Sequence, residues 1–213
     1  MPKLINKIIK VLITSDFFLN LGWGFLSPVF AIYILGKIAD SPLQAAQIAG
    51  LSALFYWIPK SFFQIPIGIY LDKNRGEKDD FWFMVCGTAI ASLIPIGYLL
   101  SSAPWHIYLL QVLYAGGMAM VIPSWLAIFT RHIDKGKEAF EWGMESTFIG
   151  IGAGVAGGLS GILISIFGFT TLFIFVSGLT MFSVILLIFA RNDISIRGKN
   201  VVIISGEKPV VGP

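Results

Sequence analysis

Long apolar stretches separated by short polar breaks form the dominant pattern of this chain. The stretches lie at about residues 11–36, 43–71, 81–101, 105–130, 144–168 and 170–190. Each is long enough for the ~20 residues that a membrane-spanning helix needs. The pattern therefore predicts an all-α membrane protein, with six transmembrane helices over residues 1–190 and a cytoplasmic tail over residues 191–213.

The composition indicates that the bilayer is the solvent of this chain. Of its 213 residues, 56% are hydrophobic and 13% are charged, a balance that soluble domains of this length do not show. The first stretch is too long and too polar for a cleavable signal peptide, so we expect it to remain as the first helix. The single cysteine, Cys86, lies within the third stretch, which excludes an intrachain disulfide and a cysteine-based metal site.

The basic residues predict the orientation. Thirteen of the fifteen Lys and Arg residues lie in the amino-terminal segment, in the 72–80 and 131–137 loops or in the carboxy-terminal tail. By the positive-inside rule, both termini face the cytoplasm. We expect an integral protein of a prokaryotic cytoplasmic membrane. Its net charge of +3 then serves orientation and contact with anionic lipids, rather than nucleic-acid binding.

Two of the stretches share a patch of small residues that is followed by a proline. The patches are residues 22–28 in the first stretch and residues 115–123 in the fourth. Such a repeated pattern is typical of a three-helix unit that is used twice in opposite orientations. Two inverted three-helix repeats are therefore expected within the six helices.

A polar break between the second and third stretches carries a signature. Gly68 and Asp72 are one helical turn apart, so they share one helix face. The break resembles the signature between helices two and three of the major facilitator superfamily, although Gly76 lies one place later than in the family pattern. The residues that carry the resemblance are Gly68, Asp72, Lys73, Arg75 and Gly76. Together with Arg131 and Glu138, these residues are expected to form a cytoplasmic gate.

The resemblance extends over residues 11–190. Residues 20–30 look like the first family helix and residues 111–131 like the fourth, although Gln111 stands where many proton-driven members have an arginine. Residues 150–161 resemble the glycine-rich antiporter signature, with Val155 in place of its proline. The resemblance implies half of a major-facilitator fold that binds a small-molecule substrate and needs no cofactor.

The six predicted helices are half of a typical family member. The two halves of such transporters share an orientation, so a second copy of the chain in a parallel, twofold-symmetric homodimer can supply the other half. Asp72 then lies at the amino end of the partner's fifth helix. Five glycines of that helix allow a close contact, either with the partner or within the chain: Gly150, Gly154, Gly157, Gly158 and Gly161.

Polar residues inside the apolar stretches are candidates for a substrate or proton pathway. Lys60 lies twelve residues before Asp72, about 18 Å at ~1.5 Å per residue. A lysine at mid-bilayer costs ~2.5–3.5 kcal/mol, so we expect Lys60 to face a wet cavity or to form a structural ion pair. The other candidates are Asp16, Asn20, Gln64, Gln111 and Glu145. For the two carboxylates, a solvated position near the cytoplasm is the competing interpretation.

These features predict a secondary transporter of a small solute, with proton-coupled efflux as one form. The alternative is a non-transporting scaffold or a subunit of a heteromeric transporter. An enzyme is not expected. Residues 158–161 resemble the serine motif of rhomboid proteases, but neither His106 nor His132 lies at the depth of Ser160 to act as its base. No metal-ligand motif is present.

Overall fold

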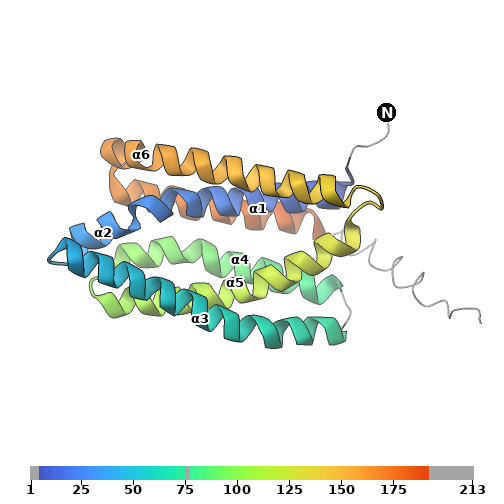
Figure 1. The fold of residues 1–213 in the computed structure, drawn as a ribbon, viewed down its shortest axis with the longest axis horizontal. Coiled ribbons are helices and arrows are strands. Elements are labelled where there is room, and N and C mark those ends of the chain that lie inside the picture. The colour runs from blue at the N-terminus through green and yellow to red at the C-terminus, as the bar shows by residue number, and fades with distance from the viewer. Residues whose placement is uncertain (1–4, 75–76, 192–213) are drawn as a thin grey trace, which may run out of the picture.

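The regular structure of this protein is helical throughout the residues that its computed structural model describes, which are 5–74 and 77–191. Figure 1 shows the arrangement. The elements are α1 (Lys7–Leu26), the short 3₁₀ helix η1 (Ser27–Val29), α2 (Phe30–Lys37), α3 (Pro42–Asn74), α4 (Glu77–Leu100), α5 (Pro104–His132) and α6 (Glu138–Phe189). The expectation of an all-α fold is thus confirmed for these residues.

Local chemistry explains where several of these helices begin and bend. Asn6 caps α1, because its side-chain oxygen accepts a hydrogen bond from the Ile9 amide at 3.0 Å. Pro28 lies in η1 and separates α1 from α2. Gly168 has a φ of 76° and a ψ of 172°, a conformation open to glycine but costly for other residues. It divides α6 into a first arm, residues 138–167, and a second arm, residues 169–189.

Within residues 5–74 and 77–191, four helical segments are long and apolar enough to cross a membrane: Lys7–Lys37, Glu77–Leu100, Pro104–His132 and Glu138–Phe189. The last contains both arms of α6. Helix α3 has 33 residues but is less apolar than these four, because Lys60, Gln64 and two prolines interrupt it. The length and composition of the helices indicate an integral membrane protein.

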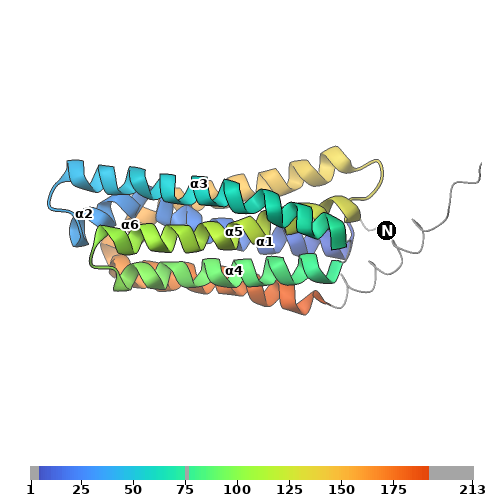
Figure 2. The ribbon, with the colours of Figure 1, turned by 90° about the horizontal axis from the view of Figure 1, so that it is seen from below.

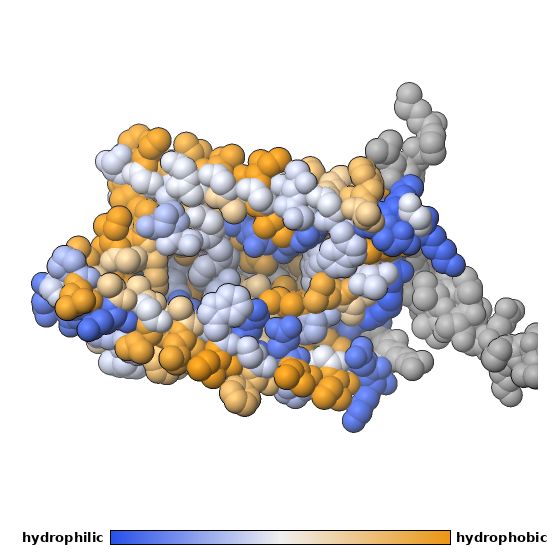
Figure 3. Space-filling view, in the orientation of Figure 1, coloured by the Kyte–Doolittle hydropathy of each residue, from blue (hydrophilic) through white to orange (hydrophobic). Residues whose placement is uncertain are grey.

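The helices form three layers, which Figures 1 and 2 show from two sides. Helix α4 and the second arm of α6 lie on one side, α1 and α5 lie in the middle, and α3 and the first arm of α6 lie on the other side. These last two form the margins of one broad face, with α1 and α5 between them. We call it the open face. Hydrophilic residues gather at the two ends of the bundle, with a mainly apolar belt between them (Figure 3).

A tight crossing fixes α5 against α4. A Cβ atom added at Gly87 would overlap the carbonyl oxygen of Gly117, and one added at Gly117 would lie 2.9 Å from the carbonyl oxygen of Gly87. The two backbones can approach this closely because neither residue has a side chain. The crossing positions the α5 residues that contribute to the site described next.

Candidate functional site

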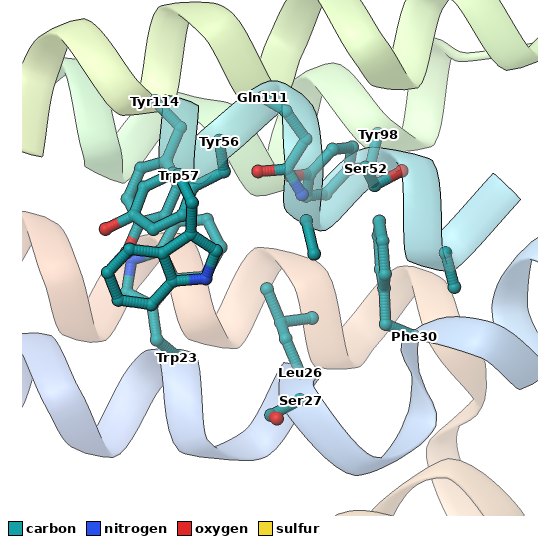
Figure 4. Close-up of a pocket in the computed structure, with 12 residues that line it drawn as sticks. Trp23, Leu26, Ser27, Phe30, Ser52, Tyr56, Trp57, Tyr98, Gln111 and Tyr114 are labelled. Atoms are coloured by element: carbon teal, nitrogen blue, oxygen red, sulfur yellow. The ribbon is translucent and has the colours of Figure 1, made fainter. Parts of the chain in front are cut away.

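A cavity of about 290 Å³ opens on the open face, in the half of the bundle where α3 and α5 begin. Residues of α1, η1, α2, α3, α4 and α5 line it: Trp23, Leu26, Ser27, Phe30, Ala49, Ser52, Ala53, Tyr56, Trp57, Tyr98, Gln111 and Tyr114. Figure 4 shows most of these side chains converging from the surrounding helices. We call this cavity the aromatic pocket, because six of its lining residues are aromatic.

Stacked rings build one wall of the aromatic pocket. The rings of Trp23 and Tyr114 stack with centroids 3.8 Å apart and planes 17° apart. Tyr56 stacks on Tyr114 in turn, at 4.8 Å and 20°, and Trp57 meets the Tyr56 ring edge-on at 5.1 Å. Because three helices supply these rings, the stack joins α1, α3 and α5 at one level of the bundle.

Lys60 lies at the rim of this wall, one helical turn after Tyr56 and Trp57. Its ammonium nitrogen is 4.4 Å from the centroid of the Trp57 ring and 5.7 Å from that of Tyr56. No carboxylate of the described residues lies within 4.0 Å of that nitrogen. Among the described residues, Lys60 therefore does not form the structural ion pair that was one of its two expected roles. The positive charge rests on aromatic faces beside the pocket.

Besides its aromatic side chains, the aromatic pocket is lined by three polar residues, Ser27, Ser52 and Gln111. Gln111 contributes its amide and Ser52 its hydroxyl, and the Ser52 hydroxyl donates to the Ile48 carbonyl of its own helix at 2.7 Å. The Trp23 indole nitrogen and the Tyr98 hydroxyl are buried, and neither has a hydrogen-bond partner among the described residues. Leaving a buried polar group unpaired costs about 1–3 kcal/mol. Both groups belong to residues that line the pocket.

Asp16 and Glu145, predicted as separate candidates, are brought together by the fold. They lie on α1 and on the first arm of α6, and their carboxyl groups interact through their charges and through a side-chain hydrogen bond. Asn20 lies one turn further along α1 and donates to the Asp16 backbone carbonyl at 2.9 Å. Neither carboxylate lines the aromatic pocket.

Gln64 lies in a different cavity, of about 500 Å³, between α3 and α5. This cavity also contains Gly68, Asp72 and Pro123. Of the residues predicted for one substrate pathway, Gln111 and the rim residue Lys60 are therefore at the aromatic pocket. Gln64 lies nearer the end of the bundle where α1 begins, and the carboxyl pair lies on another helix contact.

The gate predicted from the signature is only partly described. Arg75 and Gly76 lie outside the described residues. Arg131 forms an ion pair with the buried carboxylate of Asp80, and Glu138 accepts a hydrogen bond from the Gly136 amide at 3.1 Å. Asp72 and Lys73 are exposed. Arg131 and Glu138 thus use separate partners.

A buried polar cluster at this same end was missed from the sequence. The Asn6 amide donates to the His132 carbonyl at 2.6 Å and to the Asp134 carboxylate at 3.2 Å, and Glu141 accepts from the Asp134 amide at 3.2 Å. The hydrogen bond from Asn6 is the main reason why the pKa of Asp134 is lowered. His132 also approaches Glu77, with 3.6 Å between ring nitrogen and carboxylate oxygen. Asn6, the polar residue just before the apolar run, was the one available signal, as a helix cap.

The five glycines predicted for a close helix contact lie on the first arm of α6. A Cβ atom added at Gly150, Gly154, Gly157, Gly158 or Gly161 would meet no other atom within 4 Å. By contrast, Gly152 packs on the Phe17 ring of α1. The described chain therefore does not use these five glycines for a contact of its own, and contact with a partner stays a prediction.

Helices long and apolar enough to cross a bilayer, packed around a partly polar pocket, define an integral membrane protein. The model of the Major Facilitator Superfamily matches residues 12–203. This chain belongs to that superfamily, as the signature break predicted.

A relative agrees with this assignment. An uncharacterized MFS-type transporter of Methanocaldococcus jannaschii is 26% identical to this chain over 194 residues. The match covers 91% of this chain and 48% of the relative. The chain thus spans about half the length of the relative that it matches.

Proposed function

We propose that this protein is a secondary transporter that moves a small solute by alternating access around the aromatic pocket. The pocket carries this proposal, because it is open on one face, lies between α1, α3 and α5, and combines stacked rings with a few polar groups. Binding sites at the midplane between helices are the rule in secondary transporters. The proposal includes six membrane-spanning helices in two inverted repeats over residues 1–190 and a cytoplasmic tail over residues 191–213. Both termini face the cytoplasm of a prokaryotic cell.

The second half of the transporter is, in this proposal, a second copy of the chain. A twofold axis along the membrane normal sets the open faces of two copies against each other and closes the aromatic pocket from the side. The uncovered glycines on the first arm of α6 support this arrangement, since small residues let two helices approach closely in a membrane. Asp72 then lies near the positive amino end of the partner's α6.

Proton coupling is proposed to use the carboxyl pair of Asp16 and Glu145. Two carboxyl groups in hydrogen-bonding contact share a proton, and they release or take it up as a unit. Their contact joins α1 to the first arm of α6, so a change in protonation would bias the packing of these two helices. Efflux in exchange for protons is the form that this arrangement suits.

A liposome experiment tests transport and coupling. The purified full-length chain is reconstituted and screened for flux of organic anions, organic cations and sugars, with and without a pH gradient. We expect flux that a pH gradient accelerates, and we expect Asp16→Asn with Glu145→Gln to remove the acceleration. Unchanged pH dependence in that double variant would remove the coupling. A monomer without flux would favour the alternative, a scaffold or a subunit of a heteromeric transporter.

A crosslinking experiment tests the dimer. In a Cys86→Ala background, Asp72→Cys is placed in one tagged chain and Glu145→Cys in a differently tagged chain. The two are then coexpressed, so that a bond between the two positions can join only different chains. We expect that heterodimeric product, together with the size of a dimer in mild detergent. Crosslinks that form only when one chain carries both cysteines would overturn the dimer.

A further inference from the structure

The charges around the aromatic pocket are unbalanced. Lys60 is the charged residue at its rim, and no carboxylate of the described residues pairs with it. The carboxylates of Asp16 and Glu145 are engaged with each other and do not line the pocket, and the charge of Asp16 acts on Tyr114 of the stacked wall rather than on Lys60. A lysine at this depth is costly unless something compensates it.

We propose that the ligand of this pocket is a small organic anion with a flat aromatic body, such as an aromatic carboxylate. This inference rests on the proposed function, because it names the substrate class of the same pocket. The anionic group pairs with Lys60, and the ring lies against the stacked wall formed by Trp23, Tyr114 and Tyr56. The ligand supplies the negative charge that the pocket does not contain.

Lys60 can give up its present contact with two aromatic rings and pair with such a ligand instead. Its ammonium group rests on the rings of Trp57 and Tyr56, and a partly exposed cation–π contact of this kind contributes only ~0.5–1 kcal/mol. A charge-assisted hydrogen bond between ammonium and carboxylate is stronger, the more so in a pocket of low dielectric. An arriving carboxylate therefore draws Lys60 toward the cavity and leaves the Trp57 ring free for an aromatic ligand.

The rest of the lining fits the same class of ligand. The aromatic rings provide apolar surface, and the side-chain amide of Gln111 can donate a hydrogen bond to a carboxylate oxygen. A cavity of about 290 Å³ is close to the lower end of the ~300–1,000 Å³ typical of ligand pockets, so the ligand is small. An organic cation would instead meet the like charge of Lys60.

Three probes with the same ring test the charge preference. The purified full-length chain in lipid nanodiscs is titrated at pH 7 with 1-naphthoate, neutral 1-naphthamide and cationic 1-naphthylmethylammonium, and binding is measured by calorimetry. We expect naphthoate to bind at least tenfold more tightly than naphthamide, and the cation most weakly. Tighter binding of the cation, equal binding of the three probes or no binding of naphthoate would overturn the inference.

Variants locate the preference at Lys60. Lys60→Gln should reduce naphthoate affinity to the naphthamide level, and Lys60→Arg should keep the preference. Lys37→Gln is the matched control. The Lys37 nitrogen lies 5.6 Å from the Tyr33 ring centroid in a similar cation–π contact, but Lys37 does not line the pocket, and its loss should change none of the affinities. A preference that survives Lys60→Gln in a folded protein would contradict the proposal.

The same series separates this inference from the proposed function. If naphthoate binds through Lys60 but no solute moves in liposomes, the anion site stands and transport fails. If another solute is transported while naphthoate shows no preference, transport stands and the anion site fails. Should Lys60→Gln not fold, the wild-type probe series together with Lys60→Arg still decides the charge preference.

Discussion

Two glycine-rich surfaces of this bundle have opposite surroundings. At the α4–α5 crossing, Gly87 and Gly117 face each other so closely that a Cβ atom on either would press on the backbone of the other helix. On the first arm of α6, five glycines have open space where a Cβ atom would stand. Both surfaces lie on long apolar helices, and both have the composition of a membrane helix contact.

The first glycine surface is a packed contact within one chain, whereas the second is uncovered and can contact another chain. Gly150, Gly154 and Gly158 are spaced four apart, so they line one side of the helix, with Gly157 and Gly161 beside them. A glycine in a helix costs roughly 0.5–1 kcal/mol relative to alanine. At the crossing, the close packing of two helices offsets this cost. On α6 the described chain offers no such compensation, which is why we assign that surface to a second copy.

The largest effect is expected at the packed surface. Gly87→Val places a side chain on the Gly117 carbonyl and against Val121, and overpacking of this kind costs ~1–3 kcal/mol or more. We expect a loss of about 3 kcal/mol in the free energy of unfolding, or failure to fold, measured by denaturation in mild detergent. The matched control is Gly116→Val, next to Gly117 but with open space around it. Equal losses of stability in the two variants would show that the close packing at the crossing does not cause the loss.

The uncovered surface should respond in the opposite way. Gly158→Leu adds a large side chain where nothing lies within 4 Å, so the free energy of unfolding of one chain should change by no more than ~0.5 kcal/mol. Dimer formation should weaken at least tenfold, because the bulk keeps the two helices apart. Analytical ultracentrifugation in detergent measures the change. A Gly158→Leu protein that remains dimeric would place the interface elsewhere.

The sequence predicted the helical fold because long apolar stretches and a charge-marked polar break are local signals. It could not distinguish Gly152, which packs on Phe17 of α1, from Gly154, which faces outward. The two differ by 200° around the helix axis at ~100° per residue, but only the direction of α1 decides which side is covered. The same holds for Asp16 and Glu145, whose meeting depends on how two helices far apart in the sequence pack.

The site was predictable in part for the same reason. Lys60 and Gln111 stood out because polar residues are rare in apolar stretches. The stack of Trp23, Tyr56 and Tyr114 did not, because aromatic residues are common in membrane helices whether they face lipid or a cavity. Asp80 and Glu77 carry charges at a helix start, where an exposed position is usual. Their burial arises from the neighbouring end of α5.

An intermediate effect is expected where the packing is tight but can relax. A Cβ atom added at Gly152 would lie 3.0 Å from the Phe17 ring edge, and the ring can move by a few tenths of an ångström, unlike a backbone carbonyl. Gly152→Ala should therefore cost about 1 kcal/mol in the free energy of unfolding. Gly154→Ala, two residues further along the open side, is the control and should be neutral or slightly stabilising. A cost at Gly154 as large as that at Gly152 would mean that the open side is covered within one chain.

The smallest effect is expected at the hydrogen bonds that join the start of α1 to the α5–α6 loop, at one end of the bundle. The Asn6 amide holds the pKa of Asp134 below its ordinary value. A carboxylate with a lowered folded-state pKa stabilises the fold above its unfolded pKa, and the stabilisation is lost as the pH falls through the folded pKa. The loss should therefore begin near pH 4, the ordinary range of an aspartate, and should reach only a few tenths of a kcal/mol because Asp134 is partly exposed.

Comparison with a matched variant isolates this contribution from that of the other carboxylates. The difference in free energy of unfolding between the wild type and Asp134→Asn, measured from pH 6 to pH 3, should shrink as the pH falls. The hydrogen bonds of Asn6 and Asp134 join parts of one chain, so the size in detergent should stay unchanged over this range. A dimer that dissociated as Asp134 became protonated would show that these hydrogen bonds also support the dimer.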